Sequence, residues 1–274
     1  MNRVSLIVAM LGALPAFSQT PVISDSGIVN SVTRDSTQPV APGSIVSIFG
    51  NQLASTSATA DSVPLSMSIA GVSVTFNGIP AAIRLVSPTL ISVQVPWETV
   101  AADGTTTGTA SVVVTQNGTP SDAKNVALAA YSPGIYAIDN LARTNMALAI
   151  NADGSLAQPV GLIPGLTSHP AQSGDVLMLL ATGLGPVDQP IVDGATSSDM
   201  TRNALTLPQV MLAGIGTTVT SATLSSSFVG AYQVQITVPT GIGSSDAAPL
   251  TLQAGGASSP TTTTIAVVTP ASPQ

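Results

Sequence analysis

Hydrophobic and polar residues alternate along several short stretches of this chain, and the alternation predicts β-strands with one buried face. Between residues 232 and 238, tyrosine, valine, isoleucine and valine occupy every second position, with glutamine and threonine between them. Residues 91–95 repeat the pattern, with isoleucine and valine alternating with serine and glutamine. A period of two is typical of antiparallel sheets that have one face on a core and the other in water.

The same order of elements occurs twice. Residues 42–50 and 173–180 each contain a glycine that begins a strongly apolar run, and residues 91–96 and 234–239 each form an alternating strand that ends at Val-Pro. Sequence repeats usually mark supersecondary units that each have their own buried face. The repeat therefore predicts an all-β protein made of two tandem antiparallel β-sandwich modules.

Two Asn-Gly pairs support this prediction. Asn77-Gly78 lies between the apolar runs 72–76 and 79–86, and Asn117-Gly118 follows residues 111–116. Asn-Gly between strand-like runs is a strong signal for a tight hairpin, because both turn residues adopt positive φ. The chain contains no amphipathic pattern that would make a helix of useful length.

The ends and the middle of the chain suggest four segments. Residues 1–18 resemble a secretory signal peptide, with Arg3, a short apolar stretch and a small-x-small cleavage site at Ala16-Phe17-Ser18. The alternative is a buried N-terminal strand or helix. Residues 19–130 are predicted to form the first sandwich, and residues 131–268 the second, with an N-terminal hairpin extension. Residues 269–274 are expected to form a flexible tail.

Composition favours a protein that works outside the cytoplasm. The chain is 44% hydrophobic but only 7% charged, has a net charge of −7 and contains no cysteine. Its surface must therefore consist mainly of serine, threonine, glutamine, asparagine and glycine. A negative chain does not attract nucleic acid or an anionic membrane surface. Beyond the signal peptide, no segment is long and apolar enough to span a bilayer. We expect a secreted or cell-surface protein, extracellular or periplasmic, without disulfides.

The chain resembles an uncharacterised Ig-like module, in the style of IPT/TIG domains, from the C-terminus of secreted acidobacterial proteins. The resemblance covers nearly all of the chain after residue 18, in the right order. It rests on residues 41–54, 72–81, 87–91, 95–98, 132–136, 151–155, 181–187 and 230–234. It implies Ig-like β-sandwiches on an exported protein, and it implies no catalytic residues.

Few residues could carry catalysis. His169 is the only histidine; it precedes Pro170, and no Gly-x-Ser-x-Gly motif supplies a nucleophile for it. One histidine and no cysteine make a zinc site implausible. Asp175, Asp188 and Asp193 lie beside proline, glycine or apolar residues, where aspartate usually stabilises turns. We therefore expect no catalytic residues, no metal site and no cofactor.

Two loops have a weak resemblance to binding motifs. Asn151-Ala152-Asp153-Gly154 matches half of an EF-hand loop but lacks the remaining acidic ligands, so a β-turn is the favoured interpretation and a weak calcium site the alternative. The glycine-rich residues 181–186 follow a strand without opening a helix. A phosphate cradle needs the amides of a helix N-terminus, so we expect a bulge or a tight corner there.

The aromatic residues decide whether a sugar-binding surface is plausible. Phe49, Phe76 and Tyr232 fall on apolar strand positions and are predicted to lie in the cores, and Tyr131 and Tyr136 are expected to pack at the module boundary. Trp97, just past a strand end, is the one candidate ligand-binding ring. The competing interpretation is that it packs over the end of the sandwich or between the modules.

These observations favour a secreted, non-enzymatic Ig-like protein for extracellular interaction or adhesion. The alternative is a glycan-binding module of a cell-surface or secreted system. A secreted hydrolase is the third hypothesis, and the sequence offers no site for it. The expected partner is an extracellular protein or a polysaccharide.

Overall fold

The computed structural model describes residues 20–99, 107–139, 145–260 and 263–269, and the regular secondary structure of this part of the chain is almost wholly β-strand, connected by turns and loops. Its one helical element is the short 3-10 helix η1, Trp97–Thr99. None of the described helical segments is long and apolar enough to cross a membrane. The predicted signal peptide and all of the predicted tail except Thr269 lie outside the described residues.

The first sandwich contains strands β1 to β11. Their bounds are β1 Val22–Asn30, β2 Ile45–Asn51, β3 Ala58–Thr59, β4 Ser68–Ile69, β5 Val72–Phe76, β6 Ile79–Pro80, β7 Ile83–Val86, β8 Leu90–Gln94, β9 Gly108–Gln116, β10 Thr119–Pro120 and β11 Lys124–Leu128. One sheet has the order β1-β2-β8-β7-β3. The other has the order β10-β9-β5-β4, with β11 beside β9 and β6 beside β5.

The second sandwich contains strands β12 to β24. Their bounds are β12 Gly134–Ile135, β13 Ala137–Ile138, β14 Met146–Ala147, β15 Ala149–Ile150, β16 Ala171–Gln172, β17 Val176–Thr182, β18 Gln209–Leu212, β19 Ile215–Gly216, β20 Thr218–Leu224, β21 Tyr232–Thr237, β22 Ser245–Ala254, β23 Ala257–Ser258 and β24 Thr264–Val268. One sheet has the order β12-β17-β21-β20, with β15 beside β17. The other has the order β13-β14-β24-β22-β18-β19, with β16 beside β24 and β23 beside β22.

The all-β, tandem-sandwich prediction is confirmed, and the sequence repeat corresponds to equivalent strand pairs. In the first copy β2 pairs with β8, and in the second copy β17 pairs with β21, both antiparallel. Each pair lies inside its sheet, flanked by strands on both sides. Central strands need apolar residues on the core face, which explains why these segments carry the clearest alternation.

Both predicted hairpins are present, and one predicted strand divides in two. Asn77-Gly78 and Asn117-Gly118 all have positive φ and connect β5 to β6 and β9 to β10. The run 79–86 is not one strand, because Ala81 and Ala82 carry the chain from one sheet to the other. Both alanines are fully buried, and small side chains let the backbone cross between the layers.

Each sandwich has its own hydrophobic core. The first is rich in valine and isoleucine from facing sheets, and the second is rich in leucine, isoleucine and alanine. Phe76 and Tyr232 are buried as predicted, but the prediction for Phe49 is wrong. On β2 the residues that point inward are Val46 and Ile48, so Phe49 alternates to the outer face and is 44% exposed.

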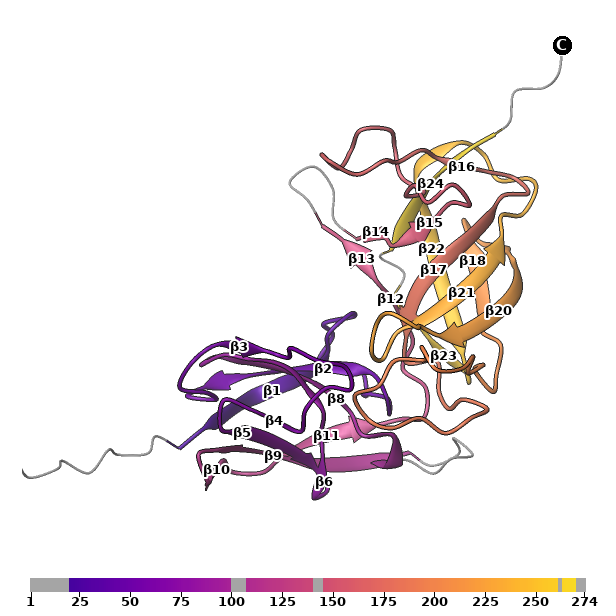
Figure 1. Cartoon of the computed structure of the whole chain (residues 1–274). Helices are drawn as coiled ribbons and strands as arrows, with labels where there is room; N and C mark the ends of the chain where they lie inside the picture. The colour runs from indigo at the N-terminus through magenta and orange to yellow at the C-terminus, as the bar shows by residue number, and fades with distance from the viewer. Residues whose placement is uncertain (1–19, 100–106, 140–144, 261–262, 270–274) are drawn as a thin grey trace, which may run out of the picture.

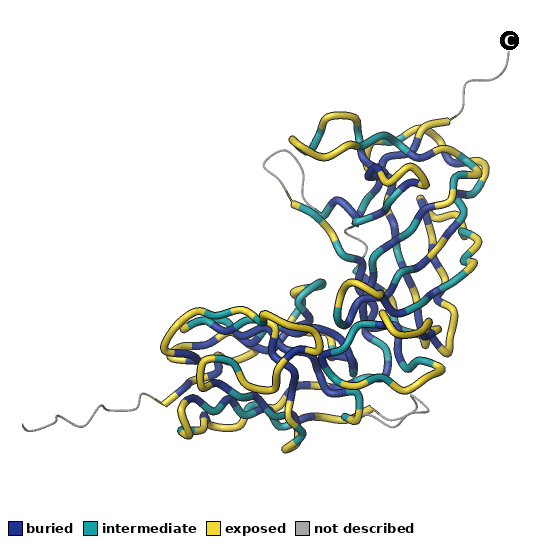
Figure 2. The backbone as a smooth tube through the Cα atoms, viewed as in Figure 1, coloured by how far each residue is buried: buried dark blue, intermediate teal, exposed yellow. Residues whose placement is uncertain are grey.

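The two sandwiches lie at a wide angle to each other and meet along a narrow zone (Figure 1). The burial map shows separate buried interiors that approach each other only there (Figure 2). The predicted hairpin extension, residues 135–172, contributes short strands to both sheets of the second sandwich.

Candidate functional site

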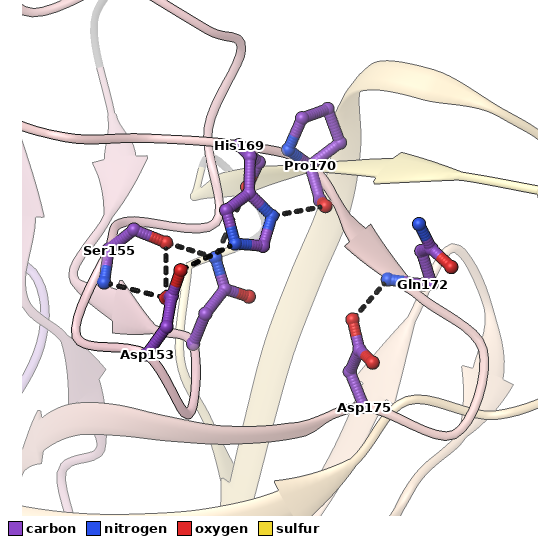
Figure 3. A network of polar contacts seen from close by, with 7 residues as sticks. Asp153, Ser155, His169, Pro170, Gln172 and Asp175 are labelled. Carbon is purple, nitrogen blue, oxygen red and sulfur yellow. Dashed lines mark hydrogen bonds and ion pairs between the residues drawn. The ribbon is translucent and has the colours of Figure 1, made fainter.

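The only histidine lies in a small polar network with the Asn151–Ser155 turn (Figure 3). His169 Nε2 is 3.2 Å from Asp153 Oδ2, and His169 Nδ1 is 2.9 Å from the carbonyl oxygen of Pro170. The Ser155 hydroxyl donates to Asp153 Oδ1 over 2.7 Å. Aspartate, serine and histidine thus meet, although the sequence separates them.

The order of these contacts differs from that of a catalytic triad. A nucleophilic serine needs its Oγ on a histidine nitrogen, whereas here Ser155 Oγ donates to the carboxylate and accepts from Asn151 Nδ2. Both imidazole nitrogens face acceptors, led by the Pro170 carbonyl, and this raises the pKa of His169. The Ser155 hydrogen bonds lower the pKa of Asp153 to about 2. The network fastens a turn to a neighbouring loop.

The other candidate aspartates have separate local roles. Asp175 Oδ2 accepts the backbone N–H of Gln172, which closes a turn. Asp188 accepts both the backbone N–H and the side-chain amide of Asn203. Across the described ranges, histidine, aspartate and glutamate form no group of three that could hold a metal ion.

Trp97 lies where the two sandwiches meet, which we call the joint. It is half-buried at the end of the first sandwich and packs against the core of the second. Its backbone N–H donates to Asp193 Oδ1 over 3.1 Å. Gly43, with φ of +74°, lies so close that a Cβ there would be 2.2 Å from the indole. The indole therefore occupies a slot that only glycine leaves open.

Residues 193–194 of the second sandwich complete the joint. The Gly194 N–H donates to Gln94 Oε1 over 2.6 Å, and its carbonyl accepts from the Leu65 N–H over 2.9 Å. Burial raises the pKa of Asp193 to about 6, opposed by the Trp97 N–H and reinforced by the nearby Glu98 carboxylate. These contacts join residues that lie 96 to 129 positions apart in sequence, so no local pattern predicts them.

The predicted tight corner at residues 181–186 holds the linker between the sandwiches. The ring of Tyr131 is enclosed by two glycines: a Cβ at Gly185 would be 2.3 Å from the ring and a Cβ at Gly255 would be 2.1 Å from it. Tyr131 packs against both hydrophobic cores, and its hydroxyl hydrogen-bonds to Thr206. The linker is therefore clamped in place.

Beside the joint, two loops of the second sandwich form what we call the loop surface: residues 183–208, between β17 and β18, and residues 225–231. The first is far longer than the roughly 12–15 residues above which an irregular loop usually has a function. The loops are hydrogen-bonded to each other, with the Ser197 N–H donating to the Ser225 carbonyl over 2.9 Å.

Arg202 organises this loop from inside. Its side chain is 7% exposed and forms a two-pronged pair with Asp199, at 2.6 and 3.0 Å. Its Nε donates to the Pro190 carbonyl over 2.8 Å. Arg202 lowers the pKa of Asp199 to about 2. The sequence analysis does not identify Arg202. The one signal for it in the sequence is the scarcity of lysine and arginine, which makes each such residue a candidate for a structural role.

The loop surface exposes large apolar side chains. Val192 is 71% exposed and Phe228 58% exposed. Met200, Leu205 and Leu207 are also exposed. A rigid loop that displays several such side chains is typical of a binding surface.

Comparison with known proteins assigns this chain to no family. No family model and no curated protein sequence matches this chain. Among solved structures, the plexin A4 extracellular region aligns with 91% of this chain and 16% of its own length, at 11% identity and a TM-score of 0.27. A surface glycan-binding protein from Prevotella bryantii aligns with 88% of this chain and 41% of its own, at 12% identity and a TM-score of 0.25.

A third structure, solved with xylogluco-oligosaccharide, aligns with 88% of this chain and 40% of its own, at 15% identity and a TM-score of 0.26. The chain thus spans less than half the length of each of these proteins. TM-scores this low carry no argument about function.

Proposed function

We propose that this is an exported, non-enzymatic binding protein whose loop surface contacts another protein outside the cytoplasm. The observation that carries the proposal is the group of exposed apolar side chains held on a rigid, hydrogen-bonded loop. We also propose that the chain is a member of the acidobacterial Ig-like family that its sequence resembles.

The charges within the loop favour a protein partner. Asp188 is bonded to Asn203 and Asp199 to Arg202, so the charged groups there are already satisfied. The loop surface therefore presents its exposed apolar side chains beside carboxylates that already have hydrogen-bond partners. Protein interfaces bury such side chains at their centre, where charged residues are depleted and aromatic residues and methionine are enriched.

The test is a variant in which Leu205, Leu207 and Phe228 are all replaced by serine. The wild-type protein, fluorescently labelled, should bind intact cells or the secreted fraction of the source organism, and protease treatment of the target should abolish the binding. The triple variant should lose the binding, whereas Val160→Ser, a change of an even more exposed apolar residue elsewhere on the second sandwich, should retain it. Equal binding by all three proteins would refute the proposal.

Two further outcomes identify other partners. Self-association of the wild type, lost in the triple variant, would make a second copy of the chain the partner. Binding that survives protease but is competed by soluble polysaccharide would favour the glycan-binding alternative.

One observation favours that alternative. The rings of Phe49 and Phe228 are exposed, and Trp97, the ring proposed to bind a glycan, is partly accessible. In this hypothesis a polysaccharide quenches the fluorescence of Trp97, the only tryptophan, and Trp97→Phe retains more binding than Trp97→Ala.

A further inference from the structure

A cavity of about 480 Å3 lies at the edge of the first sandwich, next to the joint. It is open to solvent and is lined by strands β3 and β7 and by the segment that follows β3. Six of its lining residues matter for recognition: Ala60, Asp61, Val63, Leu65, Arg84 and Leu85. The volume falls within the usual range of small-molecule sites, about 300–1,000 Å3.

Half of the lining residues are apolar, and Thr59 and Ser62 add two hydroxyl groups to the lining. Leu65 is buried, Leu85 is half-buried, and Val63 is 55% exposed at the rim. The Leu65 backbone is fixed by its hydrogen bond to Gly194, so the joint holds this side of the cavity in place. An apolar lining with a few oriented polar groups is the usual composition of a ligand pocket.

Arg84 is the unusual member of the lining. Elsewhere in the described ranges Arg34, Lys124 and Arg202 each have a carboxylate partner at 2.6 to 3.9 Å, whereas Arg84, which is exposed, has none. Its charge also reaches across the joint, where it partly offsets the rise that burial causes in the pKa of Tyr136. An unpaired guanidinium beside an apolar cavity is a ready partner for an anion.

We propose that this cavity binds a monocarboxylate with an apolar body. Arg84 would hold the carboxylate, since a guanidinium matches both carboxylate oxygens at once, and Val63, Leu65 and Leu85 would cover the apolar part. Asp61, exposed at the same cavity, repels a second negative charge, which favours monoanions over dianions. The ligand is either a free organic acid or the C-terminal carboxylate of a protein chain that ends in an apolar residue.

The test is an NMR titration of the full chain with phenylacetate. The backbone amides of Ala60, Asp61 and Leu85 should shift, while phenylacetamide, which lacks the charge, and acetate, which lacks the apolar body, should bind at least about tenfold more weakly. Arg84→Gln should weaken phenylacetate binding to the same extent. Arg34→Gln, a matched change of an exposed arginine, should leave it unchanged.

A second variant protects the test against effects on folding. Val63→Asp places a negative charge at the exposed rim and should also abolish binding while the rest of the amide spectrum stays native. The proposal is overturned if acid and amide bind equally, if the two arginine variants behave alike, or if the cavity amides do not respond.

Peptides separate the two sources of the ligand. If a peptide with an apolar C-terminal residue and a free carboxylate binds at least about tenfold more tightly than phenylacetate, and its amidated form does not, the ligand is a protein C-terminus. If the peptide binds no better, it is a free organic acid. The cavity shares no lining residue with the loop surface, so failure here leaves the proposed protein contact standing, and the reverse also holds.

Discussion

Asp193→Asn should make the protein more stable at neutral pH. In the wild type the Asp193 carboxylate is half-buried at the joint, accepts the Trp97 N–H and lies near Glu98, and its pKa rises from 3.8 to about 6. Ionised Asp193 is therefore penalised in the folded state. Asparagine keeps the acceptor for the Trp97 N–H and removes the charge.

The size of the effect follows from the shift. A difference of about two pKa units between folded and unfolded states corresponds to about 3 kcal/mol. Because Asp193 is only half-buried, solvent screening reduces the expected effect to about 1–2 kcal/mol. A raised folded-state pKa contributes stability that is complete below the unfolded value and is lost as pH rises through the folded value. The variant and wild type should thus be equal below about pH 4, diverge between about pH 4 and about pH 6, and keep a constant difference above about pH 6.

The assay is urea unfolding followed by Trp97 fluorescence, from about pH 4 to about pH 8. Taking the difference between the two proteins cancels every other titrating group. Asp122→Asn, a change of an exposed aspartate far along the sequence from the joint, is the control variant. If Asp193→Asn is equally or less stable at every pH, the assigned burial and neighbours of this carboxylate are wrong.

Three further predictions concern the joint, the linker and export. Trp97→Ala should lower the free energy of unfolding by about 2–3 kcal/mol, less than a fully buried aromatic residue, and Trp97→Phe by much less, in urea titrations followed by circular dichroism. Gly255→Ala should lower the melting temperature clearly, because its Cβ would collide with Tyr131, whereas Gly256→Ala shares the positive φ but has no atom within 4 Å and should cost less. If the two glycine variants lower the melting temperature equally, the collision with Tyr131 does not cause the loss of stability. N-terminal sequencing of the exported protein should show cleavage after Ser18; a cytoplasmic protein that keeps its first residues would contradict the signal peptide.

Much of the fold could be predicted from sequence because the determining signals are local. The alternation in β21 and β8 and the turn at Asn77-Gly78 depend on neighbouring residues, and those neighbours fix which face is buried. Phe49 shows the limit of this reasoning. It belongs to an apolar run, but which of two alternating apolar positions faces the core depends on the sheet above it.

The candidate site could not be predicted, because its contacts are long-range. The sequence indicates that Trp97 is either a ligand-binding or a packing residue, but it indicates only a turn at Asp193, and nothing near Asp193 in sequence shows that it accepts the Trp97 N–H. Arg202 likewise lies within an irregular loop, where neither the two-residue period of a strand nor the 3.6-residue period of a helix applies. Loop conformation is set by tertiary hydrogen bonds, which leave no periodic trace in the sequence.

Most hydrogen bonds of the joint connect uncharged groups, the exception being the one from the Trp97 N–H to the Asp193 carboxylate, and this bears on how the protein responds to ionic strength. The hydrogen bonds of Gln94, Leu65 and Gly194 involve no full charges, and the one ion pair that spans the two sandwiches, among the residues described, is Arg34–Asp139 at 3.9 Å on the surface. Dissolved salt weakens exposed ion pairs but has little effect on packed glycines and amides. The angle between the sandwiches, and with it the orientation of the loop surface, should therefore persist from dilute to strongly saline solution.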